Sequence, residues 1–298
     1  MSYYVAIFFS KFFCLLPAAF CDWIGTILGH LTWYVVPEKR RNMAIDNVRR
    51  CLKVDDREAL RIAKLSWVRF GPMLFEVLRF PVMKQHFSEL VEIEGTEYLK
   101  EGLKLGRGGV IAGAHCGNWE LMGGALSAAG FPIVGVAKKQ KEAGADKFIN
   151  EFRRLVGMHI TYKDNIREMF QMMKKGWYIG LLMDQDPFIR DGIIIDWFGR
   201  PTNCVQGPAV LARYKDAPLY PGYIHRNPDG THKITIYPRI EVPHTDDKEA
   251  DIRQAIEAVN AVLEQHIRKY PEEWFWLHNR WKSIDEYNEQ HDIDQQIK

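Results

Sequence analysis

The first part of this 298-residue chain is dominated by apolar residues. Within residues 3–36, only Lys11, Asp22 and His30 are strongly polar interruptions. No uninterrupted run reaches the roughly 18 residues typical of a clean membrane span. We therefore expect residues 1–36 to be a retained membrane anchor, either a marginal span or a helical hairpin lying in the lipid interface. The alternative is a buried pair of helices within a soluble core.

From residue 105 to 283, short apolar runs alternate with helical patterns. Strands are predicted at 132–137, 158–162, 178–183, 193–197, 219–225 and 232–240, and helices near 144–156, 165–175, 206–215 and 247–268. Such alternation predicts an α/β domain with a mostly parallel or mixed sheet.

The segments on either side of this α/β region are simpler. Residues 37–104 are predicted to form a helical lead-in, with one amphipathic helix over 56–79 that Pro81 ends. A short strand at Val91 and a helix near 96–104 lead into the central strand. Residues 284–298 are polar and are expected to form a loose tail.

The chain is organised around residues 109–120. Residues 109–114 are small and apolar without alternation, as expected of a strand covered on both faces. Asn118 is a good N-cap for a helix that runs to about Ala129 and stops at Gly130. His115 is then expected at the carboxyl end of the strand, and Glu120 in the first turn of the helix.

His115 and Glu120 can meet only if the chain bends between them, because five residues span about 140° on a continuous helix. Gly117 permits such a bend. Glu120 could then hold one imidazole nitrogen as an N–H donor and leave the other free as a base. The competing interpretation is a satisfied core histidine and a charge at a helix start.

Further polar residues follow other predicted strands, at the sheet edge where the chemistry of α/β proteins gathers. Lys138, Lys139 and Lys141 can bind phosphates or can be solvated surface lysines. Arg153 and Arg154 end an otherwise apolar helix and are expected to form structural or functional pairs.

Two acids, Asp184 and Asp186, end the strand predicted at 178–183. They could bind a metal with His115 and Glu120, or form salt bridges with the two arginines. No second histidine and no H-E-x-x-H pattern supports a metal, so none is expected. Residues 198–202 resemble a turn that presents polar groups to the same edge.

Charge and cysteine content narrow the class of protein. The formal net charge of +2 argues against a nucleic-acid binder built on bulk charge, and the mean hydropathy of -0.26 excludes a polytopic membrane protein. Five cysteines without C-x2-C spacing suggest neither a disulfide framework nor a zinc ribbon. A reducing, cytoplasmic setting is expected.

A basic collar follows the apolar segment. Its cations are Lys39, Arg40, Arg41, Arg49, Arg50 and Lys53. Such a collar suits the anionic cytoplasmic face of a membrane, or equally the solvated face of a helix.

The densest aromatic and basic cluster lies at residues 271–282. Alternation places Trp274, Trp276, His278 and Arg280 on one side. Amphipathic aromatics beside cations suit a membrane-interface edge, and core packing accounts for them equally well.

Taken together, these motifs resemble the lipid A biosynthesis acyltransferase family, which comprises lauroyl and myristoyl transferases. The resemblance is carried by His115-Cys-Gly-Asn-Trp-Glu120, Arg153-Arg154 before Gly157, Asp184-Gln-Asp186, Phe198-Gly-Arg-Pro and the cluster at 271–282. The H-x4-E element alone is shared with glycerolipid acyltransferases in general. The resemblance covers nearly the whole chain.

The resemblance implies a mixed sheet flanked by helices, as in glycerolipid acyltransferases, in an acyltransferase domain at 37–298. It implies an enzyme of the inner membrane whose site faces the cytoplasm, with acyl carrier protein as donor, a lipid A precursor as acceptor and no cofactor. Nucleic acid is not an expected partner. His115 would be the general base and Glu120 its orienting partner, with Arg153, Arg154, Asp184, Asp186 and Asn118 around the substrate.

Elementary chemistry agrees with this expectation. A thioester already has a good leaving group, so the enzyme needs a base on the acceptor hydroxyl and donors for the oxyanion. Cys116 is not expected to be a nucleophile, because neighbouring side chains on an extended segment point to opposite faces.

Three alternatives remain open at this stage. They are a thioesterase that uses the same dyad, a non-catalytic lipid-binding protein, and an acyltransferase on another glycolipid such as phosphatidylinositol mannoside. The acyl-chain length, the acylated hydroxyl, and a carrier-protein or coenzyme A donor are equally open.

Overall fold

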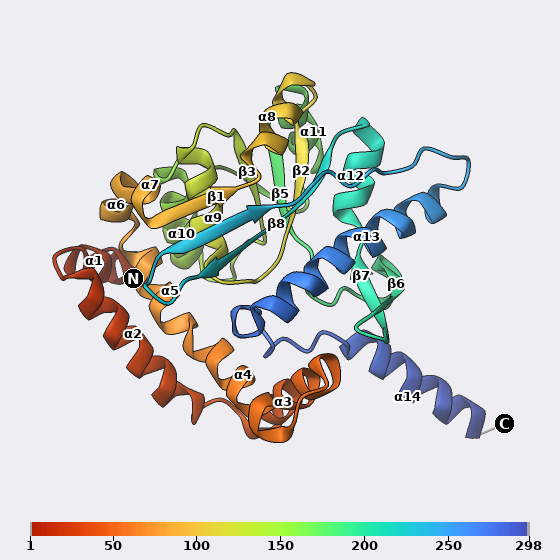
Figure 1. The fold of residues 1–298 in the computed structure, drawn as a ribbon, viewed down its shortest axis with the longest axis horizontal. Helices are drawn as coiled ribbons and strands as arrows, with labels where there is room; N and C mark the ends of the chain where they lie inside the picture. Colours follow the sequence, from red (N-terminus) through yellow and green to blue (C-terminus); the bar gives the residue numbers. More distant parts are fainter. Residues whose placement is uncertain (1, 297–298) are drawn as a thin grey trace.

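The centre of the molecule is a seven-stranded mixed sheet with strand order β1-β9-β8-β2-β5-β3-β4 (Figure 1). The computed structural model describes residues 2–296, with side chains to residue 290. The strands are β1 (Val91–Glu94), β2 (Gly109–Gly113), β3 (Ile133–Ala137), β4 (His159–Tyr162), β5 (Tyr178–Leu182), β8 (Leu219–Arg226) and β9 (His232–Ile236). Strands β8, β2, β5, β3 and β4 run parallel, whereas β9 is antiparallel to β8.

Strand β2 lies between β8 and β5, and all five of its residues are buried. Ile111 faces one hydrophobic cluster, and Val110 and Ala112 face the other. This explains why its sequence shows no alternation, since both faces of the sheet are covered.

Helices cover both faces of the sheet. One face packs against α8 (Thr96–Lys104), α9 (Trp119–Ala128) and α10 (Ala143–Leu155). The other packs against α11 (Ile166–Lys174), α12 (Gly207–Lys215) and α13 (Lys248–Lys269). The prediction of a sheet flanked by helices is therefore confirmed.

The prediction of one continuous helix over 56–79 is wrong. It is divided into α4 (Asp56–Val68) and α5 (Phe70–Leu78), followed by the short α6 (Phe80–Met83) and α7 (Phe87–Leu90). A Cβ on Gly71 would lie 1.8 Å from the carbonyl oxygen of Gly25, so only glycine fits where the chain crosses α2. Pro72 has no N–H to donate to the carbonyl of Val68, so a single helix is interrupted there.

Three other predicted elements differ in extent or kind. Strand β9 ends at Ile236, before Pro238, which has no N–H to donate to a sheet. The turn at Phe198 and Gly199 joins β6 (Gly192–Trp197) to β7 (Arg200–Val205) in a two-stranded antiparallel ribbon. The predicted loose tail is instead helix α14 (Lys282–Gln296); residues 297–298 lie outside the described part of the chain.

The apolar N-terminal stretch forms two helices, α1 (Ser2–Cys14) and α2 (Ala18–Trp33), at the left of Figure 1. Many large apolar side chains of these helices and of the turn between them are exposed, among them Phe8 (64%), Leu15 (84%) and Trp23 (59%). Between residues 2 and 296, no helix is both long and apolar enough to cross a membrane. Because so many of its apolar side chains are exposed, the pair is not fully buried in the core.

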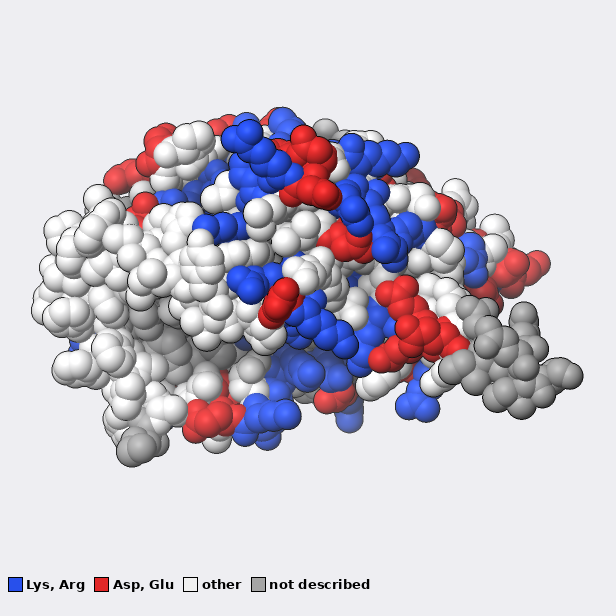
Figure 2. Space-filling view, turned by 90° about the horizontal axis from the view of Figure 1, so that it is seen from below, with Lys and Arg blue, Asp and Glu red and all other residues white. Residues whose placement is uncertain are grey.

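This end of the molecule carries few charged residues in Figure 2, whereas Lys and Arg gather over its middle. The basic collar lies on α3 (Glu38–Leu52) and its C-cap Lys53. Asp46 pairs with both Arg49 and Arg50, so this part of the collar is partly neutralised.

Candidate active site

The turn that follows β2 carries the imidazole of His115 away from the strand. Gly117 has a φ of 51°, and a Cβ there would lie 2.7 Å from the carbonyl oxygen of Ile224. Its backbone N–H donates to the carbonyl of Glu273 (2.8 Å). Asn118 then caps α9, because its Oδ1 accepts from the backbone N–H of Leu121 (3.0 Å). The predicted strand, turn and helix are all confirmed.

Asp184 is the hydrogen-bond partner of His115. Its Oδ1 lies 2.8 Å from Nδ1 of the ring, and its Oδ2 accepts from the backbone N–H of His115 (3.0 Å). Trp274 donates its indole N–H to the same Oδ2 (2.8 Å). The sheet register explains the meeting: Gly113 pairs with Leu182, and each polar residue lies two positions beyond its strand.

Burial and charge act in opposite directions on these two groups. Burial alone would lower the pKa of His115, but Asp184 and the more distant Glu120 outweigh it and raise that pKa. Burial would likewise raise the pKa of Asp184, yet His115 and the N–H donors hold it at about 2. Asp184 therefore stays ionised and fixes the ring of His115.

The predicted orienting role of Glu120 is not confirmed. Both of its carboxylate oxygens bind Arg153, at 2.7 Å from Nε and 2.6 Å from Nη2. The bend at Gly117 directs His115 toward the end of β5, whereas the first turn of α9 carries Glu120 toward α10. The ion pair is largely buried, and Asn150 accepts a further hydrogen bond from Arg153 (3.2 Å).

The two adjacent arginines are separated by the structure. Arg153 faces Glu120, whereas Arg154 is exposed. The salt bridge considered between these arginines and Asp184 or Asp186 is therefore not formed; Arg153 pairs with Glu120 instead.

Asn118 and Asp186 have structural partners here. Asn118 is buried as the cap of α9, and Asp186 accepts from the hydroxyl (2.7 Å) and backbone N–H (2.8 Å) of Ser283. Asp186 therefore ties the end of β5 to the start of α14.

Three side chains around His115 were not singled out as site residues from the sequence. The ring of Trp119 packs edge-on against the imidazole, with centroids 4.8 Å apart, and Gln185 Nε2 lies 3.3 Å from Nε2 of His115. Trp274 holds Asp184. The sequence shows that Trp119 and Gln185 are neighbours of the His115 and Asp184 motifs. It does not show where these side chains point, because that depends on the fold.

The aromatic cluster at 271–282 is core rather than an interfacial edge. Trp274, Trp276 and Trp281 are at most 2% exposed. Arg280, fully buried, donates to the backbone carbonyl of Asn203 (2.6 Å) and so ties this segment to β7. His278 accepts from the backbone N–H of Asp186 (3.0 Å), and burial lowers its pKa to about 4.

The remaining candidate groups do not join the site around His115. Cys116 is buried, and burial raises the pKa of its thiol well above the ordinary value. Lys138, Lys139 and Lys141 are exposed. Within the described residues, no three His, Cys, Asp or Glu side chains form a group that could hold a metal ion.

An apolar cavity of ≈ 90 Å³ adjoins the site. Trp119, Glu120 and Arg153 line it at the side of His115, and glycines of β2, β3, β5 and α9 line it further along. Met158 packs directly against two of them: a Cβ on Gly123 or Gly135 would lie 2.5 or 2.8 Å from its Cε. The absence of side chains at these positions creates the space.

An imidazole held by a carboxylate beside an apolar cavity can serve as a general base, the chemistry that acyltransferases and hydrolases of acyl substrates share. The family follows from the sequence match: the family model described as "Bacterial lipid A biosynthesis acyltransferase" matches residues 1–283. The chain belongs to this family, and the resemblance noted from its motifs is confirmed.

Individual relatives are distant. The phosphatidylinositol mannoside acyltransferase of Mycolicibacterium smegmatis is 27% identical over 82% of this chain and 79% of its own length. The lipid A biosynthesis lauroyltransferase of Escherichia coli K12 is 26% identical over 68% and 65%. A solved structure, the 1-acyl-sn-glycerophosphate acyltransferase PlsC of Thermotoga maritima, has 15% identity and a TM-score of 0.38, covering 85% of this chain and 98% of that one.

Proposed function

We propose that this acyltransferase moves a fatty acyl chain from an acyl carrier protein thioester to a hydroxyl of a lipid A precursor, with His115 as general base. The observation that carries the proposal is the 2.8 Å contact between Nδ1 of His115 and Oδ1 of Asp184. Because Asp184 is ionised, it accepts the Nδ1 proton of the neutral ring. Nε2 is then the unprotonated nitrogen. It accepts from the amide of Gln185 (3.3 Å), which an acceptor hydroxyl displaces when it binds.

In the proposed reaction, Nε2 of His115 takes the proton of the acceptor hydroxyl while its oxygen attacks the thioester carbonyl. The tetrahedral intermediate collapses, the carbon–sulfur bond breaks, and the thiolate takes the proton back from the imidazolium. Asp184 stabilises the imidazolium between these steps without itself taking the proton. No covalent acyl-enzyme is needed, in keeping with the buried, protonated thiol of Cys116.

The developing oxyanion needs a hydrogen-bond donor near the base. Gln185 is the side chain best placed for this, since its Nε2 lies 3.3 Å from Nε2 of His115. Arg153 is already occupied by Glu120 and Asn150. We therefore propose that Gln185 donates the hydrogen bond to the oxyanion. The Glu120–Arg153 pair forms part of the rim of the apolar cavity.

The apolar cavity next to Trp119 is the proposed site of the acyl chain. It is lined mainly by apolar side chains and glycines, and its charged lining residues, Glu120 and Arg153, neutralise each other. A fatty chain placed there has its carbonyl end beside Trp119, whose ring touches the imidazole of His115.

We also propose that the enzyme works at the cytoplasmic face of the inner membrane, with α1 and α2 lying in the lipid interface. The exposed side chains of Phe8, Leu15 and Trp23 support this placement, because a surface this apolar is otherwise unfavourable in water. The cations of α3 adjoin it and suit anionic headgroups.

A glycolipid such as phosphatidylinositol mannoside is the second candidate acceptor, because the mycobacterial relative that carries this name is similar over most of the chain. The two acceptors are separated by one experiment. The purified protein is incubated with lauroyl and palmitoyl thioesters of acyl carrier protein or of coenzyme A, and with each acceptor in turn, and the products are identified by mass.

We expect an acylated lipid A precursor with the carrier-protein donor. If only the mannoside is acylated, the proposed lipid A acceptor is wrong. If only the coenzyme A thioester gives product, the proposed carrier-protein donor is wrong. Release of free fatty acid without any acylated lipid would instead indicate a thioesterase.

A further inference from the structure

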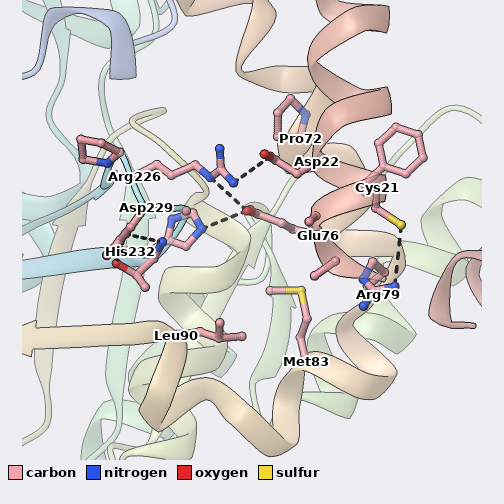
Figure 3. Close-up of a pocket in the computed structure, with 16 residues that line it drawn as sticks. Cys21, Asp22, Pro72, Glu76, Arg79, Met83, Leu90, Arg226, Asp229 and His232 are labelled. Atoms are coloured by element: carbon pink, nitrogen blue, oxygen red, sulfur yellow. Dashed lines mark hydrogen bonds and ion pairs between the residues drawn. The ribbon is translucent and has the colours of Figure 1, made fainter. Parts of the chain in front are cut away.

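A second cavity, of ≈ 320 Å³, is lined by Glu76, which accepts a hydrogen bond from Asn118 in the turn after β2 (Figure 3). Helix α2, helix α5 and the β8–β9 hairpin line it, and exposed residues such as Ala18 and Asp229 form part of its wall, so it is open to solvent. Figure 3 shows the carboxylate of Glu76 extending from α5 into the middle of this cavity.

Glu76 has partners on three different elements. Its Oε1 lies 3.0 Å from Nε2 of His232 and 3.5 Å from Nε of Arg226, and its Oε2 accepts from Nδ2 of Asn118 (2.7 Å). Burial opposes ionisation of Glu76, but these partners outweigh it and lower its pKa. An ionised carboxylate is therefore held against the cap residue of α9.

The carboxylate of Glu76 decides which way the amide of Asn118 faces. A carboxylate only accepts hydrogen bonds, so Asn118 must turn its NH₂ group toward Glu76. Its oxygen is then left for the backbone N–H of Leu121, which it accepts at 3.0 Å. Reversing the amide would place two donors face to face at the start of α9 and break the cap.

The cap in turn fixes the neighbouring side chains of the site. Trp119, which packs against the imidazole of His115, and Glu120, which binds Arg153, directly follow Asn118. A shift of the first turn of α9 moves both of them relative to His115. Displacements of this kind cost catalysis because the reacting groups lose their alignment.

We propose that Glu76 is a positioning residue of the active site, which holds the amide of Asn118 from the second cavity and so keeps Trp119 and Glu120 in place beside His115. This inference rests on the acyltransferase reaction proposed above. It assigns a positioning role to a largely buried carboxylate that touches no reacting atom.

The proposal can be tested by exchanging the amide of Asn118 and the carboxylate of Glu76, since an amide and a carboxylate have nearly the same size and shape. Asn118→Asp sets two carboxylates against each other, and we expect it to lower kcat about tenfold or more, because misalignment by a fraction of an ångström suffices for such losses. Adding Glu76→Gln restores the hydrogen bond in the opposite direction, because the new amide at position 76 can donate to the new carboxylate at position 118. The double variant is expected to recover kcat to within about threefold of wild type.

A second experiment relies on the fact that the cavity around Glu76 is open to solvent. Glu76→Ala removes the carboxylate, and acetate in the buffer can enter the vacated space. We expect acetate to restore kcat of Glu76→Ala while leaving wild type unaffected. Asp22→Asn is the matched control: Asp22 faces the same cavity and pairs with Arg226 (2.7 Å), but it reaches Asn118 only through other side chains.

Each variant is measured for kcat, KM and thermal midpoint together, so that a loss of folded protein is not mistaken for a loss of rate. Recovery of kcat by the double variant at an unchanged thermal midpoint supports positioning. Wild-type kcat in Asn118→Asp, or additive losses in the double variant, overturns the inference. A wild-type protein without transferase activity instead contradicts the proposed function.

Discussion

Asp184 binds His115 twice, at Nδ1 of the ring (2.8 Å) and at the backbone N–H (3.0 Å). This double contact fixes both the rotation of the imidazole and the end of β2 that carries it. Trp274 completes the arrangement, because its indole N–H satisfies the same carboxylate from the other side (2.8 Å). The imidazole is thus presented by two neighbouring strands and a distant C-terminal segment.

Asp184→Asn tests this contact directly. An amide presents a donor or a neutral acceptor, so the ring of His115 loses the anion that selects its Nδ1–H tautomer. We expect kcat to fall by about 10²- to 10⁴-fold, as for the aspartate of a catalytic triad, with little change in KM. Steady-state kinetics on the acylated product measure the effect, and a loss under about threefold would contradict the assigned role.

The pH dependence of kcat/KM follows from the raised pKa of His115. A general base must be neutral, so activity is lost as the pH falls below the pKa of the free enzyme's imidazole. Asp184 and Glu120 raise that pKa above its ordinary 6.5, so the acid limb is expected to have its midpoint above 6.5. A midpoint at or below 6.5 in wild type would contradict this effect of the two carboxylates.

In Asp184→Asn, the acid limb should move to lower pH, because the anion that favoured the imidazolium is gone. Glu120→Gln should move it in the same direction by less, since Glu120 acts on His115 only through its charge. These shifts are read from kcat/KM profiles of the residual activity.

Removing Arg153 should destabilise the fold more than removing its neighbour. Arg153→Met leaves the carboxylate of Glu120 buried without its partner, which costs about 3–5 kcal/mol of unfolding free energy for a buried pair. Arg154→Met is the matched control, since Arg154 is exposed and should change stability by under about 0.5 kcal/mol. Denaturant titrations measure both, and equal losses would contradict the importance of the pair.

Chain-length preference is expected to depend on Met158. Its side chain extends about three heavy atoms beyond Cβ. Met158→Ala therefore opens room in the apolar cavity, and the preferred donor should lengthen by about two to four carbons. Gly135→Ala should act in the opposite direction, because its new Cβ would lie 2.8 Å from Cε of Met158 and push it into the cavity.

Competition between acyl donors of different length measures this preference. Met169→Ala is the control, because Met169 is a buried methionine of α11 that does not line this cavity. An unchanged profile in Met158→Ala would place the acyl chain elsewhere.

Binding to lipid should depend on the exposed apolar side chains of α1, α2 and the turn between them. Leu15→Asp and Trp23→Asp are expected to weaken sedimentation with anionic phospholipid vesicles by about tenfold each, because each replaces an exposed apolar side chain that would contact lipid with a charge. Ile166→Asp, at the exposed start of α11, serves as the control. Equal binding by all three variants would contradict the proposed interface.

The strand, turn and helix that carry His115 could be predicted because their signals are local: small apolar residues, Gly117, and Asn118 as a cap. The partner of His115 could not, because it depends on which strand lies beside β2. The chain passes through β3 and β4 before β5 returns to that place, and only the register of Gly113 with Leu182 brings Asp184 to His115.

The break between α4 and α5, in contrast, has a local cause. Pro72 has no N–H to donate to the carbonyl of Val68, four residues earlier, so a continuous helix is interrupted there. The burial of Trp274 and Trp276 was undecidable from the sequence, since amphipathic aromatics suit a membrane edge and a protein core alike.

The most direct test of the account compares wild type with His115→Ala in a single-turnover reaction, with acyl carrier protein thioester and lipid A precursor both bound. The product is quantified by mass spectrometry, and thermal unfolding checks that both proteins are folded. The account predicts acylated lipid from wild type and a rate at least about 10³-fold lower from the variant. Product from folded His115→Ala at the wild-type rate would contradict it.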